Sequence, residues 1–187
     1  AGLDIKARQD GADTVEFVPG EPQLTDIVPL MRRAPQPIVA LLHGPVNGGG
    51  FAMALAADFR FAGESLKMND AFARIGMSGC AMGVSYFLPV ARELIYTGCF
   101  VDAARAVAIG LASASGPDET LAELAQPLLD DLLSVSPTGL RQSKRTLDAC
   151  QAVDDLETVI ALESRAQSLC QETGDFEEAM RAFLEKR

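Results

Sequence analysis

Three consecutive glycines, Gly48, Gly49 and Gly50, have the clearest potential for chemistry in this sequence. They follow an apolar run over residues 38–42 and precede a stretch rich in alanine, leucine and methionine. N–H groups at the start of a helix have no partner within the helix, and the helix dipole adds positive potential there. Because glycine has no Cβ, a ligand can approach such a turn closely. The pattern predicts a site for an anion or a developing oxyanion, and a tight turn that binds nothing is an equally good interpretation.

The elements on either side of the glycines are predicted from apolar runs and helix-breaking residues. Residues 38–42, bounded by Pro37 and Gly44, have the length and composition of a strand covered on both faces. Residues 51–57 have a helix-forming composition. Residues 58–62 alternate between apolar and polar positions and predict the next strand.

The rest of the chain divides into a mixed part and a helical part. Asp102 is expected to cap one helix, and Gly174 with Asp175 is expected to cap the last. Helices are predicted over residues 24–33, 84–96 with Pro89 as an interruption, 103–109, 117–133, 137–150, 154–170 and 174–187. Strands are predicted over 66–69 and 111–114, and irregular structure over 71–83. This order predicts an α/β core over residues 1–115 and a helical region over residues 116–187.

Composition limits the possible partners and compartment. The 187 residues are 48% hydrophobic, enough for a sizeable core, and carry a net charge of −10, which argues against nucleic acid as a partner. No apolar run approaches the roughly 20 residues that span a bilayer. The four cysteines form no Cys-x-x-Cys pair and there is one histidine, so no metal site is expected and free thiols in the cytoplasm are the default.

Taken together, these motifs resemble the crotonase superfamily, the enoyl-CoA hydratase/isomerase family. The resemblance covers almost the whole chain in the family's order. The matching stretches are residues 1–6, 37–60, 75–76 with the glycine loop after them, 94–98, 108–112, 143–145 and 182–187. It implies a crotonase-like core built as a spiral of ββα turns, with a C-terminal helical region that forms homotrimers, often paired into hexamers.

The resemblance also implies an acyl-CoA ligand, with coenzyme A carried by the substrate and no separate cofactor. Two backbone N–H groups polarise the thioester carbonyl in this family, and the matching positions are Leu3 and Gly49. Fixed donors of this kind stabilise the charge that gathers on the oxygen as an enolate forms. The positions that match the family's CoA contacts are Leu3, Asp4, Ile5, Lys6, Gly49, Phe183 and Lys186. A solvated helix end is the alternative interpretation of Lys186.

The sequence departs from the family pattern where protons are transferred. Hydratases of the family carry one glutamate three residues after the oxyanion glycine and a second before the Ile-Gly segment. The matching positions hold Ala52 and Phe72. Some relatives place an aspartate in the following loop, where this chain has Cys80 and Ala81. Since acid/base groups typically contribute about 10²–10⁴-fold, simple hydration should be nearly abolished.

Asp70, two residues before Phe72, is the nearest remaining carboxylate and a candidate catalytic acid; a solvated loop residue is the alternative. Asp58 matches a family aspartate that looks structural. His43, Cys80 and Tyr86 are expected to be a structural histidine, a buried inert thiol and a core residue.

Two features differ from the family in length. The sequence starts at the first oxyanion motif, where family members have strands and helices before it, and the connection over residues 89–92 is several residues short. Three hypotheses remain open: an acyl-CoA hydratase or isomerase with unusual proton donors, a non-catalytic acyl-CoA binding protein, and a scaffolding subunit that retains only the trimer-forming surface.

Overall fold

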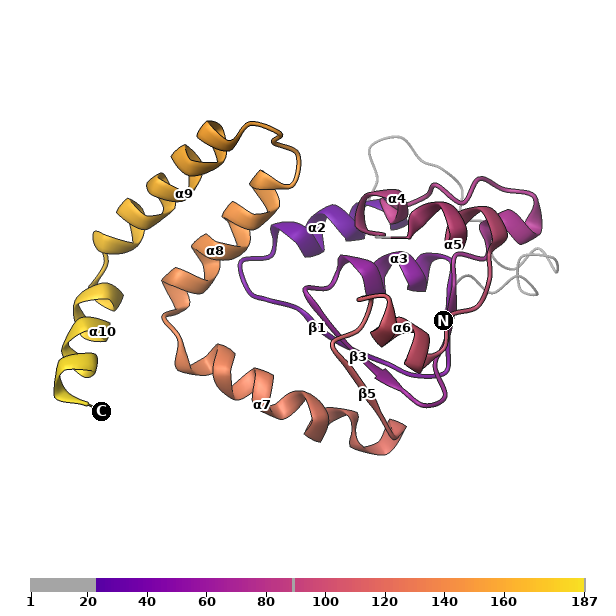
Figure 1. The fold of residues 1–187 in the computed structure, drawn as a ribbon, viewed down its shortest axis with the longest axis horizontal. Helices are drawn as coiled ribbons and strands as arrows, with labels where there is room; N and C mark the ends of the chain where they lie inside the picture. The colour runs from indigo at the N-terminus through magenta and orange to yellow at the C-terminus, as the bar shows by residue number, and fades with distance from the viewer. Residues whose placement is uncertain (1–22, 89, 187) are drawn as a thin grey trace. The chain divides into compact units, whose positions relative to one another are not determined.

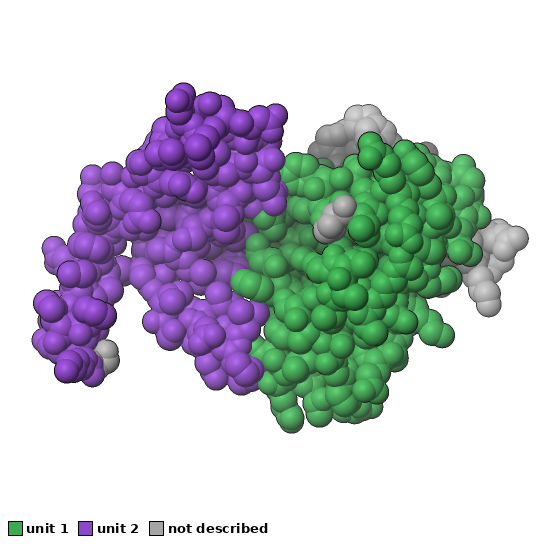
Figure 2. All heavy atoms as spheres, viewed as in Figure 1, with its two compact units in different colours: residues 1–32, 38–125 green, residues 33–37, 126–187 purple. Residues whose placement is uncertain are grey.

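The computed structural model describes residues 23–88 and 90–186. The chain divides into two compact units, which Figure 2 shows in different colours. Unit 1 comprises residues 1–32 and 38–125, and unit 2 comprises residues 33–37 and 126–187. Leu3, Asp4, Ile5 and Lys6 lie outside the described residues, so their predicted roles stay predictions. Within the described ranges, no helix is long and apolar enough to cross a membrane.

Unit 1 contains two small parallel sheets that the chain visits in alternation. Its strands are β1 (Val39–Leu42), β2 (Pro45–Asn47), β3 (Phe59–Gly63), β4 (Lys67–Asn69) and β5 (Ala114–Gly116). One sheet has the order β1-β3-β5 and the other pairs β2 with β4. Each turn of the chain thus adds one strand to each sheet, and helix α3 (Gly49–Ala56) completes the first ββα turn (Figure 1). This confirms the predicted α/β class and spiral arrangement.

The remaining elements of unit 1 are short. They are η1 (Leu24–Asp26), α2 (Ile27–Arg33), η2 (Phe72–Ile75), α4 (Val84–Phe87), α5 (Ala91–Thr97) and α6 (Ala103–Ala108). The predicted cap at Asp102 is confirmed, because its side chain accepts a hydrogen bond from Arg105 N at 2.8 Å. Gly98 ends α5 in the left-handed conformation, which glycine adopts without strain.

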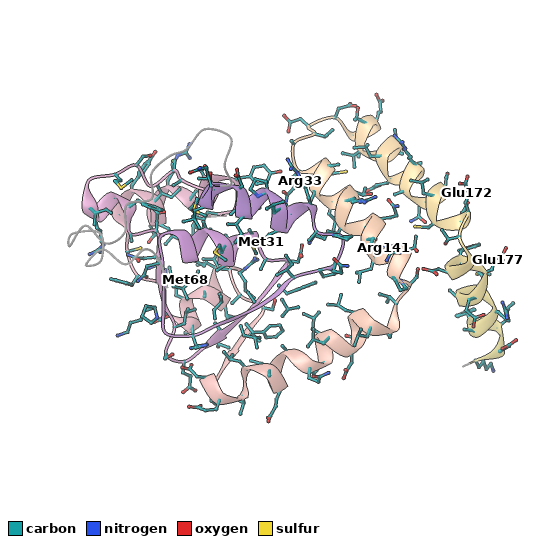
Figure 3. The ribbon with its side chains drawn as sticks, turned by 180° about the vertical axis from the view of Figure 1, so that it is seen from behind. Met31, Arg33, Met68, Arg141, Glu172 and Glu177 are labelled. Atoms are coloured by element: carbon teal, nitrogen blue, oxygen red, sulfur yellow. The ribbon has the colours of Figure 1, made fainter. Side chains whose placement is uncertain are left out.

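Helix α3 lies at the centre of the core of unit 1. Phe51, Ala52 and Ala56 are fully buried, and Leu55 is almost so. A helix that is apolar on all sides is expected to be covered on all sides. Met68 of β4 is also fully buried, and Met31 of α2 packs against the same core; Figure 3 labels both methionines.

The partly buried guanidinium of Arg60 closes the C-terminal end of α3. It donates to the carbonyl oxygens of Leu55 (3.2 Å) and Ala57, and also to that of Leu111. The last carbonyls of a helix have no partner within the helix, so this side chain satisfies them. Desolvation on burial lowers the pKa of Arg60. The contact fixes α3, and with it the glycine turn at the other end of the helix.

Unit 2 is helical. Its helices are α7 (Leu121–Ser134), α8 (Pro137–Cys150), α9 (Leu156–Gln171) and α10 (Gly174–Glu185). The first turn of α7 still belongs to unit 1, where it follows η3 (Asp118–Thr120). Ser136 caps α8, and Pro137 stands at the first helical position, where proline is favoured. The predicted cap of α10 by Gly174 and Asp175 is wrong. Thr173 is the N-cap, and the Asp175 carboxylate instead accepts from Thr138 N of α8 at 3.1 Å.

Two strand predictions also need correction. The strand expected over residues 111–114 lies at Ala114–Gly116, because the N–H groups of Leu111 and Ala112 donate back to Ala106 O at 2.8 and 3.0 Å. Strand β2 was not predicted, since it has three residues and begins with a proline. It matters for the site because it leads directly into the glycine turn.

Candidate functional site

The glycine turn has the geometry expected of a site for a negatively charged oxygen. Gly48 adopts φ +52° and ψ −117°, a region that favours glycine, and its N–H donates to Asn69 O at 3.2 Å. The first hydrogen bond of the helix joins Ala52 N to Gly48 O at 3.1 Å. The N–H groups of Gly49, Gly50 and Phe51 therefore have no partner inside α3. These donors lie at the positive end of the helix dipole.

Apolar side chains surround this turn. A Cβ built on Gly48 would lie 3.6 Å from Cζ of Phe72, and one built on Gly49 would lie 3.5 Å from Cδ2 of Leu24 and 3.6 Å from Sδ of Met82. In such surroundings a hydrogen bond to a charged oxygen is electrostatically stronger than in water. The turn can thus stabilise an oxyanion if a ligand displaces the flexible Met82 side chain.

Neither position that matches a family glutamate carries a group able to transfer a proton. Ala52, three residues after Gly49, is fully buried in the core. The ring of Phe72, in η2, lies against Gly48. The structure therefore places both residues at the glycine turn, with a methyl group and an aromatic ring in place of two carboxylates.

A buried amide network supports the turn from the neighbouring strand. Asn69 is 3% exposed, and its Nδ2 donates to Gly98 O at 3.0 Å. With its amide nitrogen facing acceptors, Asn47 of β2 donates to Oδ1 of Asn69 at 2.8 Å. Gly98 O also accepts from Nε of Arg74 at 2.7 Å. These bonds link β2, β4 and the end of α5, so Asn69 has a structural role.

Asp70 is fully buried, which overturns the expectation of a solvated loop residue. Within the described part of the chain, neither of its carboxylate oxygens has a hydrogen-bond partner. Burial raises the pKa of Asp70 to about 6, because the charged form loses its hydration. The carboxyl lies against Gly79, where a built Cβ would be 2.4 Å from Oδ2 of Asp70. Such unsatisfied, titratable groups concentrate at functional sites.

Other expectations are corrected or left open by the structure. Cys80 is exposed, and Tyr86 is 55% exposed instead of lying in the core. The side chain of Phe183 on α10 is 80% exposed, and Lys186 is the exposed residue that ends this helix. Their predicted contacts with CoA stay predictions. Asp58 is structural, as expected, and its partners are Arg32 and Ile38 N.

A polar cluster at the carboxyl ends of β1, β3 and β5 was not predicted. Ser65 Oγ accepts from Gly44 N at 2.8 Å, and Ser65 N donates to Asp118 Oδ1 at 3.1 Å. The Ser65 hydroxyl also pairs with the Asp118 carboxylate, and these hydrogen bonds lower the pKa of Asp118. His43 is exposed beside them. Because the hydroxyl is engaged as donor and acceptor, this cluster holds the sheet edge together.

Comparisons with known proteins agree with this architecture. A sequence profile described as enoyl-CoA hydratase/isomerase matches residues 1–187. A protein of Mycobacterium tuberculosis described as "Probable enoyl-CoA hydratase EchA12" is 35% identical over 171 residues, which are 88% of this chain and 60% of that protein. The enoyl-CoA isomerase/hydratase fer4 of Mycosarcoma maydis is 31% identical over 195 residues, covering the whole chain and 70% of that protein.

The fold is shared with solved structures. The crystal structure of an enoyl-CoA hydratase from Polaromonas sp. JS666 superimposes with a TM-score of 0.87 at 24% identity, covering 100% of this chain and 75% of the other. The described part of the chain thus has the crotonase fold. Since the chain spans about 60% of the length of the first curated relatives, their activities do not transfer with the fold. The profile match over all 187 residues, with relatives above 30% identity, shows that this chain belongs to the enoyl-CoA hydratase/isomerase family.

Proposed function

We propose that this protein binds an acyl-CoA thioester with its carbonyl oxygen at the Gly49 N–H, and catalyses hydration or isomerisation of an enoyl-CoA. The observation that carries the proposal is the start of α3, where the N–H of Gly49 has no partner within the helix and lies among apolar side chains. Leu3 N–H is the proposed second donor, by the family resemblance.

The proposed chemistry uses the turn to stabilise charge. When a proton leaves the carbon next to the thioester, or a nucleophile adds to the double bond, electron density moves to the carbonyl oxygen. A fixed N–H that already faces this oxygen needs no reorganisation, and one such donor is worth about 10²–10³ in rate in other enzymes. Coenzyme A would be part of the substrate. Phe183 and Lys186 are proposed to contact this CoA, and the protein is proposed to form homotrimers or hexamers.

A non-catalytic acyl-CoA binding protein is the second candidate. The observation that favours it is the replacement of both proton-transfer positions by Ala52, which is buried, and Phe72, which packs on Gly48. Such a protein would retain the oxyanion contact and bind thioesters without converting them.

The test replaces Gly49 in two ways. Gly49→Pro removes the N–H at the first helical position, where proline is tolerated. Gly49→Ala keeps the N–H, and its Cβ would make ordinary contacts of 3.5 and 3.6 Å. Binding of butyryl-CoA is measured by calorimetry, and turnover of crotonyl-CoA and vinylacetyl-CoA by absorbance.

We expect Gly49→Ala to bind and turn over like the wild type, and Gly49→Pro to lose about 10²–10³ in rate. Binding without turnover of either enoyl-CoA would favour the non-catalytic candidate. A wild-type protein that binds no acyl-CoA would overturn both candidates and leave a scaffolding role.

A further inference from the structure

Asp70 is the one carboxylate in the two described segments around the glycine turn. Residues 44–57 and 66–83 together contain no other aspartate or glutamate. Removing a proton from carbon requires a base, and a carboxylate is suited to this when its pKa lies near the working pH. The other titratable side chains of these segments are Lys67, Arg74 and Cys80.

The segment that carries Asp70 is attached to the turn on both sides of this residue. The preceding carbonyl, Asn69 O, accepts the Gly48 N–H at 3.2 Å. Two residues further on, the Phe72 ring packs against Gly48, and Phe72 N donates to Asp70 O at 2.8 Å. The backbone of Asp70 is therefore fixed relative to the proposed oxyanion site.

One loop covers both the carboxyl and the turn. In residues 76–83, Gly79 packs against the Asp70 carboxyl and Met82 lies beside Gly49. Gly79 and Met82 lie three residues apart in the sequence, so one short loop contacts both the carboxyl and the turn. A thioester at Gly49 would meet Met82, and moving this loop aside would also move Gly79 away from the Asp70 carboxyl. The loop ends at Met82 and Gly83, which both have positive φ angles, +51° and +79°.

No charged side chain compensates Asp70 within the described elements around it. On α5, which contributes Ile95 to the contact at Gly79, Arg92 is exposed and Glu93 pairs with Arg105. Arg74 donates to Gly98 O and lies 5.6 Å from the ring of Phe100, and Lys67 and Cys80 are exposed. A buried carboxyl without partners costs stability, and its retention calls for a function.

We propose that the Asp70 carboxyl is the proton-carrying group of this site, an inference that rests on the proposed thioester function. The carboxylate takes a proton from the α-carbon: the C–H bond breaks, an O–H bond forms on Asp70, and the C–H electron pair moves into an enolate whose oxygen accepts the Gly49 N–H. In a β,γ-unsaturated thioester the enolate extends to the γ-carbon. Asp70 then returns the proton there, and the double bond moves into conjugation with the carbonyl.

A single carboxyl favours this proton shift over hydration. Isomerisation needs one group that accepts and returns the same proton, with no other reactant. Hydration needs a group to activate water and a proton for the α-carbon, and the two described segments around the turn, residues 44–57 and 66–83, offer one carboxylate. The inferred substrate class is therefore a β,γ-unsaturated acyl-CoA.

The test compares the wild type with Asp70→Asn, which keeps the shape and cannot carry the proton. Glu64→Gln removes one exposed carboxylate of unit 1 away from the turn and is the matched control. Exchange of the α-protons of butyryl-CoA in deuterated water is followed by NMR, conversion of vinylacetyl-CoA to crotonyl-CoA by absorbance, and affinity for butyryl-CoA by calorimetry.

We expect Asp70→Asn to slow exchange and isomerisation by about 100-fold or more with unchanged affinity, and Glu64→Gln to match the wild type. The inference is overturned if the exchange and isomerisation rates of Asp70→Asn stay within about threefold of the wild-type rates. It is also overturned if the wild type binds butyryl-CoA but neither exchanges its α-protons nor isomerises vinylacetyl-CoA. In both cases the proposed thioester binding still stands. Failure of the wild type to bind butyryl-CoA would overturn the proposed function and the inference together.

A second measurement covers the case in which Asp70→Asn does not fold. The wild-type isomerisation rate should fall as the pH drops through about 6, because the protonated carboxyl cannot act as a base. A rate that is constant between about pH 5 and pH 8 would overturn the inference.

Discussion

The carboxylate of Asp58 accepts a hydrogen bond from the backbone N–H of Ile38 at 2.7 Å. Asp58 precedes β3 and Ile38 precedes β1, so the bond fixes the starting points of two paired parallel strands. The other oxygen of Asp58 accepts from Nη1 of Arg32 at 3.1 Å, and the same guanidinium nitrogen donates to Ala56 O at the end of α3. One partly buried carboxylate thus joins α2, α3 and the first sheet, and it holds the scaffold behind the glycine turn.

Asp58→Ala is therefore expected to destabilise the protein by about 1.5–3 kcal/mol, because it leaves a backbone donor and a guanidinium without their charged acceptor. The free energy of unfolding in urea measures this. Glu64→Ala removes an exposed carboxylate directly after β3 and should change the free energy of unfolding by less than about 0.5 kcal/mol. Equal losses in the two variants would contradict a structural role for Asp58.

Gly79→Ala tests the close contact between the loop and the Asp70 carboxyl. An alanine Cβ would lie 2.4 Å from Oδ2 of Asp70 and 2.6 Å from Cγ2 of Ile95, so the loop has to move. We expect a loss of about 1–3 kcal/mol in thermal or urea unfolding. Gly174→Ala, where no atom lies within 4 Å of the added Cβ, is the control and should be neutral or slightly stabilising. Unchanged stability of Gly79→Ala would show that Gly79 is not packed against Asp70 in solution.

The burial of Asp70 predicts an unusual pH dependence of stability. Its pKa is raised from 3.8 to about 6 on folding, so the folded protein binds this proton more tightly than the unfolded chain. The stability contributed by protonated Asp70 is present at low pH and is lost as the pH rises from about 4 to about 6. In Asp70→Asn this loss is absent. The variant should gain about 2–3 kcal/mol relative to the wild type between about pH 4 and pH 7.

Urea unfolding of both proteins at several pH values measures that difference, and the other titrating groups cancel in the comparison. A difference between wild type and Asp70→Asn that does not change with pH would show that the carboxyl is solvated. This outcome would also remove the physical basis for its raised pKa.

The sequence predicted the turn better than its surroundings. Gly48, Gly49 and the start of α3 follow from local rules, since a triple glycine between an apolar strand and a helix-forming stretch leaves few conformations. The burial of Asp70 could not be predicted, because it depends on Gly79 and Ile95, which lie nine and 25 residues further along the chain and reach Asp70 only through the fold. A polar residue after a short strand is ordinarily solvated.

The same limit explains the error at the start of α10. Residues 173–175 have the local composition of a helix cap, and the sequence gives no sign that a second helix competes for the Asp175 carboxylate. In the structure it accepts from Ser136 Oγ at 3.0 Å and from Thr138 N at 3.1 Å, across 37 residues or more. Local capping rules identify the residue type correctly and assign it to the wrong helix.

Asp175→Asn is expected to weaken the attachment of α10 to α8. Hydrogen bonds from Thr138 and Ser136 lower the pKa of Asp175. Their contribution to stability is therefore present at neutral pH and is lost only as the pH falls below the usual pKa of an aspartate. Limited proteolysis at neutral pH should cleave α10 faster in Asp175→Asn than in the wild type. The control is Glu172→Gln, which removes an exposed charge at the end of α9 (Figure 3) and should be cleaved at the wild-type rate. Equal cleavage of all three proteins would show that Asp175 does not hold the two helices together.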